Sequence, residues 1–270
     1  MPMMRKALFI FRLAFIERSA YRVNFILEIS GGILSILIVV FLWLAVYRSS
    51  GRAELGGYSL AEMITYLLGG GLINSFLLTT AENPETSRAI QDGTLSNLLI
   101  QPINPYWVWL LRDLAGKAFL GVIGLAGYAI VALFLNERLV FLFDPLRLIL
   151  FGVALAAAVL LQFLTFESLN LLAFWVENTY GFRFTMRVIM EMAGGAIIPL
   201  TFFPDLLQKV FALLPFPYLV YFPMRIYLNK IEFAEILPEL VRAAAWMAGL
   251  AGLNAILWKR GLRQYTSMGD

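Results

Sequence analysis

Seven ionisable residues lie inside apolar runs of the sequence or at their edges, where a charge is costly and often functional. Three are carboxylates and four are basic: Glu28, Glu167, Glu191, Arg112, Lys117, Arg183 and Arg187. Carboxylates spaced across a bilayer could pass protons or bind cations. Glu167, however, lies about 29 Å from the outer start of its run at 1.5 Å per residue, which places it near the cytoplasmic boundary. The others fall at the same depth, so the pattern favours ion pairs that fasten helix ends over a proton relay.

The sequence offers few candidate residues for catalysis or for metal binding. The chain has no Cys and no His, which excludes disulfides, thiolate nucleophiles, His-ligated metals and imidazole bases. Neither a Gly-x-x-x-x-Gly-Lys-Ser/Thr phosphate loop nor a Gly-x-Ser-x-Gly nucleophile elbow occurs. The run Gly69-Gly70-Gly71 lies inside an apolar segment and indicates close packing or flexibility, and not a phosphate-binding loop. We therefore expect no catalytic residues, no metal and no cofactor in this chain.

The composition indicates that the bilayer is the solvent of this protein. Of its 270 residues, 60% are hydrophobic and 14% charged, whereas soluble domains carry roughly 25% charged residues. The apolar runs are continuous and long, which predicts helices and not a barrel of short alternating strands. The net charge of +3 fits basic cytoplasmic edges better than nucleic-acid binding.

The apolar runs predict an all-α integral membrane protein with a single domain over residues 1–270. Before the first run, Met4, Leu8, Phe11 and Phe15 form a stripe at helical spacing. Because Arg12 interrupts the apolar stretch, residues 1–22 are predicted to be an interfacial helix and not a cleavable signal. Six spans are expected at about 25–47, 60–80, 118–135, 148–175, 188–203 and 241–258.

Two of these regions are irregular. Residues 106–135 would make a helix of about 45 Å, longer than the roughly 30 Å hydrocarbon core, so we expect an interfacial start before a span from Ala118. The fifth span is short, and Gly194, Gly195, Pro199 and Pro204 are predicted to form a turn at its outer end. Residues 204–214 and 217–228 are then predicted to be two short re-entrant helices that dip into the outer leaflet.

Basic residues predict the orientation. With the N-terminus inside, thirteen of the 21 Lys and Arg residues fall on the cytoplasmic side and eight elsewhere, which favours cytoplasmic termini. The thirteen are Arg5, Lys6, Arg12, Arg18, Arg22, Arg88, Arg112, Lys117, Arg183, Arg187, Lys259, Arg260 and Arg263.

Two local motifs resemble a known family. One is Arg88-Ala-Ile-Gln-Asp-Gly-Thr-Leu-Ser-Asn-Leu-Leu-Ile-Gln-Pro-Ile-Asn-Pro, after the second span, and the other is Gly194-Gly-Ala-Ile-Ile-Pro-Leu-Thr-Phe-Phe-Pro, followed by Leu213-Leu-Pro-Phe-Pro. In this order they resemble the ABC-2 type permeases, the membrane subunits of ABC exporters. With Tyr21-Arg22 before the first span, the chain is similar to an uncharacterised subgroup that pairs two permeases with one ATPase.

The resemblance implies a coupling helix that docks on a cytoplasmic ABC ATPase. Residues 86–99 would supply it, with apolar anchors, flanking charges and a bounding glycine. The residues implied in coupling are Arg88, Ile90, Asp92, Gly93, Leu95, Leu98 and Leu99.

The resemblance also implies the partners. The chain would form half of a transmembrane pathway with a second copy or a related permease, in the plasma or inner membrane of a prokaryote, while ATP and Mg bind the partner ATPase. An ion-coupled secondary transporter is the alternative, but it requires midplane binding groups at broken helices in both halves of the chain. A membrane-embedded enzyme is disfavoured by the absence of His and Cys.

Overall fold

A computed structural model of the chain describes residues 11–13, 16, 38–78, 84–135, 139–141 and 143–265. Within these ranges the regular structure is helical except for one hairpin of two short antiparallel strands, β1 (Glu54–Leu55) and β2 (Tyr58–Ser59). The helices are Ile38–Ser50, α3 (Leu60–Leu78), α4 (Glu85–Gln91), α5 (Leu95–Leu99), α6 (Pro105–Leu135), α7 (Pro145–Leu171), α8 (Tyr180–Ala193), α9 (Asp205–Ala212), α10 (Tyr221–Tyr227) and α11 (Phe233–Gly261), with 3-10 turns η2 (Leu172–Phe174), η3 (Leu200–Phe202) and η4 (Phe216–Tyr218).

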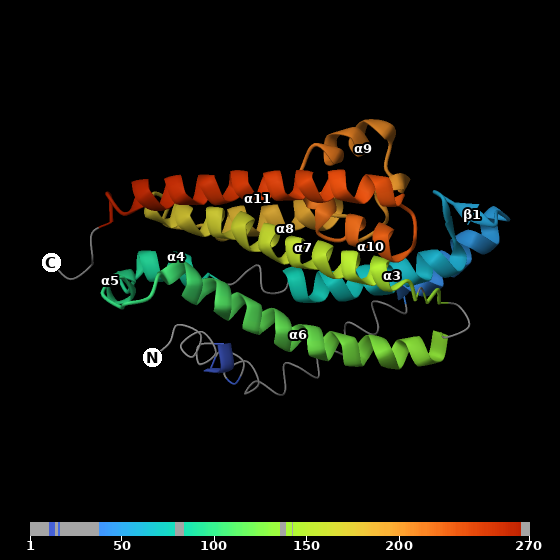
Figure 1. Cartoon of the computed structure of the whole chain (residues 1–270), viewed down its shortest axis with the longest axis horizontal. Helices are drawn as coiled ribbons and strands as arrows, with labels where there is room; N and C mark the ends of the chain where they lie inside the picture. The colour runs from blue at the N-terminus through green and yellow to red at the C-terminus, as the bar shows by residue number, and fades with distance from the viewer. Residues whose placement is uncertain are drawn as a thin grey trace.

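Four of these helices, α3, α6, α7 and α11, are long and apolar enough to cross a membrane. They run lengthwise through the molecule (Figure 1). Helices α4 and α5 lie at one end, which we call the α4 end, and the β1–β2 hairpin lies at the other, the hairpin end. The chain is therefore a multi-pass membrane protein whose two ends differ in structure.

The predicted spans agree with the structure to different degrees. Helices α3 and α7 coincide within a few residues with the second and fourth, and α11 covers the sixth but begins eight residues before its predicted start at Val241. For the first, only its second half is described, as the helix Ile38–Ser50. The predicted interfacial helix over residues 1–22 lies outside the described residues, apart from residues 11–13 and 16, which are helical.

The third predicted span is part of a longer helix. Helix α6 is continuous from Pro105 to Leu135, and the interfacial position of its first turns stays a prediction. Lys117 forms an ion pair with Asp113 one turn earlier, and its side chain is buried. Arg112 pairs with Glu85 of α4. A helix can keep such charges when each has a partner.

The fifth predicted span, 188–203, is wrong as a continuous helix. Helix α8 begins at Tyr180, eight residues before Val188, and ends at Ala193. Gly194 caps it, and Gly195 follows with a φ of +75°, a left-handed conformation that favours glycine. Gly194 and Gly195 thus end the helix about ten residues before the predicted end of the span, whereas Pro199 and Pro204 precede η3 and α9.

Local sequence explains how several elements begin. Ser59 and Glu62 bond each other's backbone at the start of α3, from Ser59 N to Glu62 Oε2 at 2.8 Å and from Glu62 N to Ser59 Oγ at 3.3 Å, which is a capping box. Asp144 caps α7, where Pro145 occupies the first turn. The hairpin turns through Gly56 and Gly57, both with positive φ, as a tight two-residue turn requires.

The two short helices predicted after the fifth span are present as α9 and α10, but their surroundings differ. Helix α10 packs on α7, and its Met224 and Ile226 are fully buried. Helix α9 has no buried residue and projects sideways from the bundle (Figure 1). A carbon at Gly69 would lie 2.7 Å from the Met224 side chain, which confirms that this glycine of the 69–71 run allows close packing.

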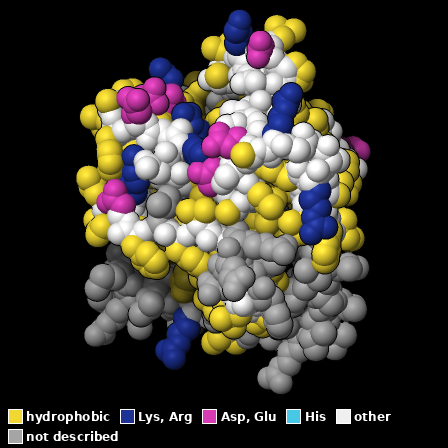
Figure 2. Space-filling view, turned by 90° about the vertical axis from the view of Figure 1, so that its right-hand side faces the viewer, with side chains coloured by type: hydrophobic (Ala, Val, Ile, Leu, Met, Phe, Trp, Pro, Cys, Tyr) yellow, Lys and Arg dark blue, Asp and Glu magenta, His cyan; other side chains and the backbone are white. Residues whose placement is uncertain are grey.

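The hairpin end carries mixed charges. Figure 2 views the molecule from this end, where acidic and basic side chains lie among one another and hydrophobic side chains surround them. Lys230, after α10, pairs with Glu62 of α3 at 2.7 Å, and Arg242 pairs with Glu239 of α11 at 2.7 Å. The first pair joins two segments, whereas the second lies within one helix; partly exposed pairs of this kind contribute little to stability.

Candidate functional site

The ends of α6, α7, α8 and α11 meet around α4 and α5, and this meeting point is the candidate functional site. The segment after α3 forms two helices and not one, because Gly93, with a φ of +74°, turns the chain between them. Asp92 ends α4, and Leu95 begins α5. Gly93 was expected to bound a single amphipathic piece over residues 86–99; that expectation is wrong, and the glycine lies inside the segment.

One face of α4 and α5 is buried within the chain. Ile90 and Leu95 pack in a hydrophobic cluster with Trp109 of α6 and Phe163 and Leu171 of α7, and Leu95 is 0% exposed. Both residues were expected to be apolar anchors for an ATPase. That expectation is wrong, since these side chains are at most 6% exposed and offer a partner almost no surface; the two residues attach the segment to its own membrane helices.

The other face of the segment is open. Arg88 and Asp92 are exposed, Leu98 is half-buried, and Leu99 and the following Ile100 are 42% and 84% exposed. A hollow of about 500 Å³ lies between this face and α6. It is lined by Glu85, Arg88, Ala89, Asp92, Thr94, Asn97, Leu98 and Arg112. We call this hollow, with Leu99 and Ile100, the platform; apolar tips beside paired charges are typical of a protein-binding surface.

A buried polar network fastens the platform to α7 and α8. From α8, Arg183 Nη1 donates to Ser87 Oγ of α4 at 2.8 Å, to Asn170 Oδ1 of α7 at 3.1 Å and to Thr179 Oγ1 at 2.9 Å. Glu167 Oε2 accepts from Thr86 Oγ1 at 3.1 Å and from Asn170 Nδ2 at 3.4 Å. These groups are buried, so the bonds act in a low dielectric, where they fix geometry strongly.

The predicted polar layer is therefore partly a connected network. Glu167 and Arg183 are joined through Asn170, whereas the Arg112–Glu85 and Lys117–Asp113 pairs hold α6 to α4 and to itself. Arg187 and Glu191 pair along α8 at 3.1 Å. Glu28 lies outside the described residues. Glu167, Arg183 and Arg112 therefore bond between segments, whereas Lys117 and Arg187 each pair within one helix; the common depth of these residues in the membrane stays a prediction.

Sequence reasoning missed several members of this site. Thr86, Ser87 and Thr179 are small hydroxyl residues in polar segments, where no pattern separates a buried one from an exposed one. Asn170 of α7 accepts from Arg183 of α8 and so forms a hydrogen bond between helices. Tyr265 was not noticed at all: its hydroxyl reaches the α4–α5 turn from beyond the end of α11.

The predicted turn residues lie away from the platform, nearer the hairpin end. Tyr66 of α3 donates its hydroxyl to Gly195 O at 2.7 Å, and Tyr221 N donates to Gly194 O at 2.9 Å. A carbon at Gly195 would meet the Tyr66 hydroxyl at 2.8 Å. The turn after α8 is thus held from two sides by α3 and α10.

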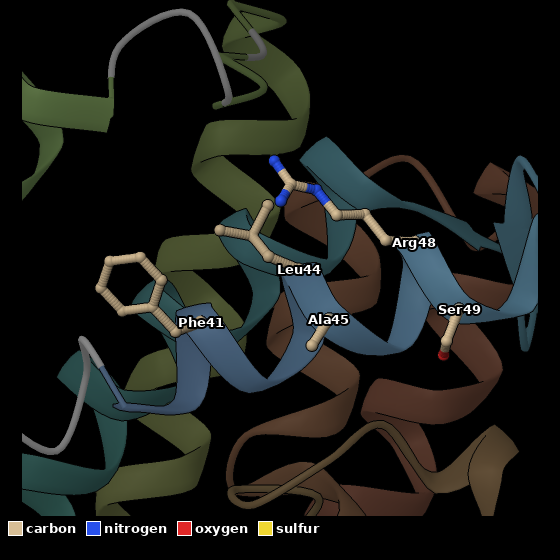
Figure 3. A pocket seen from close by; sticks show the side chains of 5 residues that line it. All are labelled: Phe41, Leu44, Ala45, Arg48 and Ser49. Atoms are coloured by element: carbon tan, nitrogen blue, oxygen red, sulfur yellow. The ribbon is translucent and has the colours of Figure 1, made fainter.

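A second hollow, of about 610 Å³, lies on the helix Ile38–Ser50. Figure 3 shows its lining: Phe41, Leu44, Ala45, Arg48 and Ser49, with the Arg48 side chain running back along the helix toward Leu44. All five residues come from one helix, so this is an open face of that helix. Its apolar side chains suit contact with lipid or with another membrane subunit.

Comparison with known proteins gives one match. A family described as ABC-2 family transporter protein matches residues 33–269. The matched region contains α3 to α11, and so both the platform and the turn after α8. No curated protein sequence matches the chain.

Proposed function

This chain belongs to the ABC-2 family of transporter proteins, as the match over residues 33–269 shows, and it is therefore a transport subunit and not itself an enzyme. We propose that it is the permease half of an ATP-driven exporter and that it docks through the platform on a separate cytoplasmic ATPase. The ATP and Mg bind to that ATPase. The family match favours this function over an ion-coupled secondary transporter.

The observation that carries the proposal is the division of α4 and α5 into two faces. The inner face, with Ile90 and Leu95, is part of the chain's own hydrophobic cluster, while Leu99 and Ile100 are exposed on the same segment as the exposed Arg88 and Asp92. Exposed apolar side chains can anchor a partner protein, and charged side chains on the same surface can form the polar rim of the contact. A docked partner would push on a segment that four membrane helices hold.

The proposed arrangement in the membrane follows from the family and from the charges. The α4 end faces the cytoplasm, because Arg112, Lys117, Arg183, Lys259 and Arg260 lie near it. Six crossings are proposed, the fifth made by α8 together with residues 194–203. A second copy or a related permease completes the pathway, and the exposed apolar faces of α6 and α11 supply surface for that subunit and for lipid.

Substitutions on the two faces test the ATPase contact. We expect Ile100→Asp to leave the protein folded, because this side chain is 84% exposed, and to weaken association with the co-expressed ATPase more than tenfold. Losing an anchor commonly costs about 2 kcal/mol, and a buried unpaired carboxylate costs more. Association is measured by co-purification from mild detergent and by titration of the labelled ATPase.

Controls separate docking from folding. Ile100→Leu keeps the apolar surface and should bind like the parent, and Arg88→Ala should mainly slow association, as expected for a charge at the rim. Leu95→Asp should instead prevent accumulation of folded protein, because Leu95 is in the core. Normal ATPase binding by Ile100→Asp at parental expression would refute docking through the platform.

A further inference from the structure

Tyr265, four residues beyond the end of α11, reaches back to the turn between α4 and α5. Its hydroxyl donates to Gly93 O at 2.6 Å and accepts from Ser96 N at 3.3 Å. It also lies 3.2 Å from Ser96 Oγ. One phenol therefore satisfies both sides of a turn that lies about 170 residues earlier in the chain.

The turn depends on such a partner because its own segment is weak. Helix α5 has only five residues, and its first turn has no side-chain cap, whereas isolated helices need about 12 residues or more to be even marginally stable. Within the turn, Gly93 has a positive φ, and Gly93 O accepts a further bond from Ser96 Oγ at 2.6 Å. Tyr265 thus stabilises the backbone from which Leu99 and Ile100 project.

Tyr265 is itself fixed to α11. Its ring packs edge-on against Phe174, with centroids 6.1 Å apart, and Phe174 packs in turn against Trp258 of α11. Gly261, the last residue of α11, lies so close to Phe174 that a side-chain carbon there would come within 2.1 Å of the ring. The end of α11, the aromatic contacts and the phenol consequently form one packed unit.

We propose that Tyr265 is a positioning residue that tethers the α4–α5 turn to α11, so that a displacement of the platform is passed to this membrane helix. The proposal rests on the proposed function, because the platform moves only if the ATPase docks there. The tether differs from the Arg183 network, whose hydrogen bonds fasten α4 to α7 and α8.

The tether can be tested on the full chain without the ATPase. Tyr265→Phe removes the hydroxyl and keeps the ring, and we expect the backbone amides of residues 94–99 to exchange with deuterium about tenfold faster in detergent, as loss of a hydrogen bond predicts. Tyr47→Phe is the matched control: it removes a hydroxyl that donates to Tyr58 O at 2.6 Å near the hairpin end, and it should leave residues 94–99 unchanged.

Ser96→Ala provides an independent arm of this test. Ser96 and Tyr265 act on one turn. The increase in the amide exchange rate of residues 94–99 in the double variant should therefore be smaller than the product of the increases in the two single variants. Exchange at residues 94–99 that is equal in Tyr265→Phe and in the parent, or fully independent effects of the two variants, would overturn the tether.

The transmission step needs the reconstituted complex with its ATPase. A cysteine at Leu237, an exposed position near the start of α11, reports motion of that helix through its maleimide reaction rate with and without ATP. We expect Tyr265→Phe to reduce the ATP-dependent change in reaction rate at least threefold. The affinity for the ATPase should stay within twofold of the parent, and Tyr47→Phe serves as the control.

A parent complex that shows no ATP-dependent change in this rate, or a Tyr265→Phe complex that keeps it, would overturn the transmission. Failure of the parent chain to bind any ATPase would instead refute the proposed function, and the exchange experiment would still decide the tether.

Discussion

Two arginines on successive turns of α8 have different surroundings and should behave differently. Arg183 is buried and donates to Ser87, Asn170 and Thr179, and it joins three segments. Arg187 lies four residues further along, is about one third exposed and pairs with Glu191 of its own helix. The burial of each arginine and the number of acceptors that it bonds, and not the residue type, decide how much it contributes to the stability of the fold.

We expect Arg183→Met to lower the free energy of unfolding by roughly 3 kcal/mol, because it leaves buried acceptors without a donor. Arg187→Met removes a partly exposed pair and should cost less than about 1 kcal/mol. Unfolding of both variants in detergent, followed by tryptophan fluorescence, gives the comparison. Equal losses in the two would contradict the assignment of the buried network.

At the scale of elements, the end of α8 is fixed by a glycine that no other residue replaces without strain. Gly195 has a φ of +75°, and an added carbon would also lie 3.0 Å from Cβ of Tyr221. Gly252, inside α11, has nothing within 4 Å of the same added carbon. The two positions therefore form a matched pair for one substitution.

Gly195→Ala should destabilise the chain by about 2 kcal/mol or more, from backbone strain and from displacement of Tyr66 and Tyr221. Gly252→Ala should be neutral or stabilising by up to about 1 kcal/mol, since alanine favours a helix. The midpoints of thermal unfolding in one detergent check both. A Gly195→Ala midpoint at or above that of the parent would mean that the turn adapts easily.

The sequence predicted elements well where one property dominates. Continuous apolar runs located α3 and α7 within a few residues, because lipid requires helices of a minimum length. The apolar run 106–135 likewise coincides with α6, which begins at Pro105. The sequence assigned Leu95 to the outer face, however, since the partners that bury it, Trp109 and Leu171, are distant in the chain.

At the scale of the whole molecule, the two ends are proposed to face opposite sides of the membrane. Single cysteines at Ser50 and Glu232, exposed near the hairpin end, should react with an impermeant thiol reagent in intact cells. Cysteines at Asn97 and Gln264, exposed at the α4 end, should react only after permeabilisation. The chain has no native Cys to interfere. Labelling of Asn97→Cys from outside would reverse the orientation and remove the platform from the cytoplasm.

The family resemblance read from the two motifs is confirmed by the match over residues 33–269, and the four long helices agree with it. The sequence predicted only part of the candidate site. Arg88, Asp92 and Leu99 do lie on an open surface, but the split at Gly93 and the contact from Tyr265 arise where separate parts of the chain meet. Local sequence patterns do not predict contacts between residues that are distant in the chain.

Helix α9 is short and exposes most of its apolar side chains, so its helical state depends on its surroundings. It has eight residues, too few to remain helical alone in water, and Leu206, Val210 and Leu213 are all exposed. Its inner contacts are few: Phe211 against Phe203, and a bond from Gln208 to Phe203 O at 2.8 Å. We therefore expect acyl chains to supply the apolar environment that a core supplies elsewhere, so that lipid acts as a structural component of this segment. A synthetic peptide of residues 203–214 should accordingly give the circular dichroism of a coil in buffer and gain helical signal when phospholipid vesicles are added.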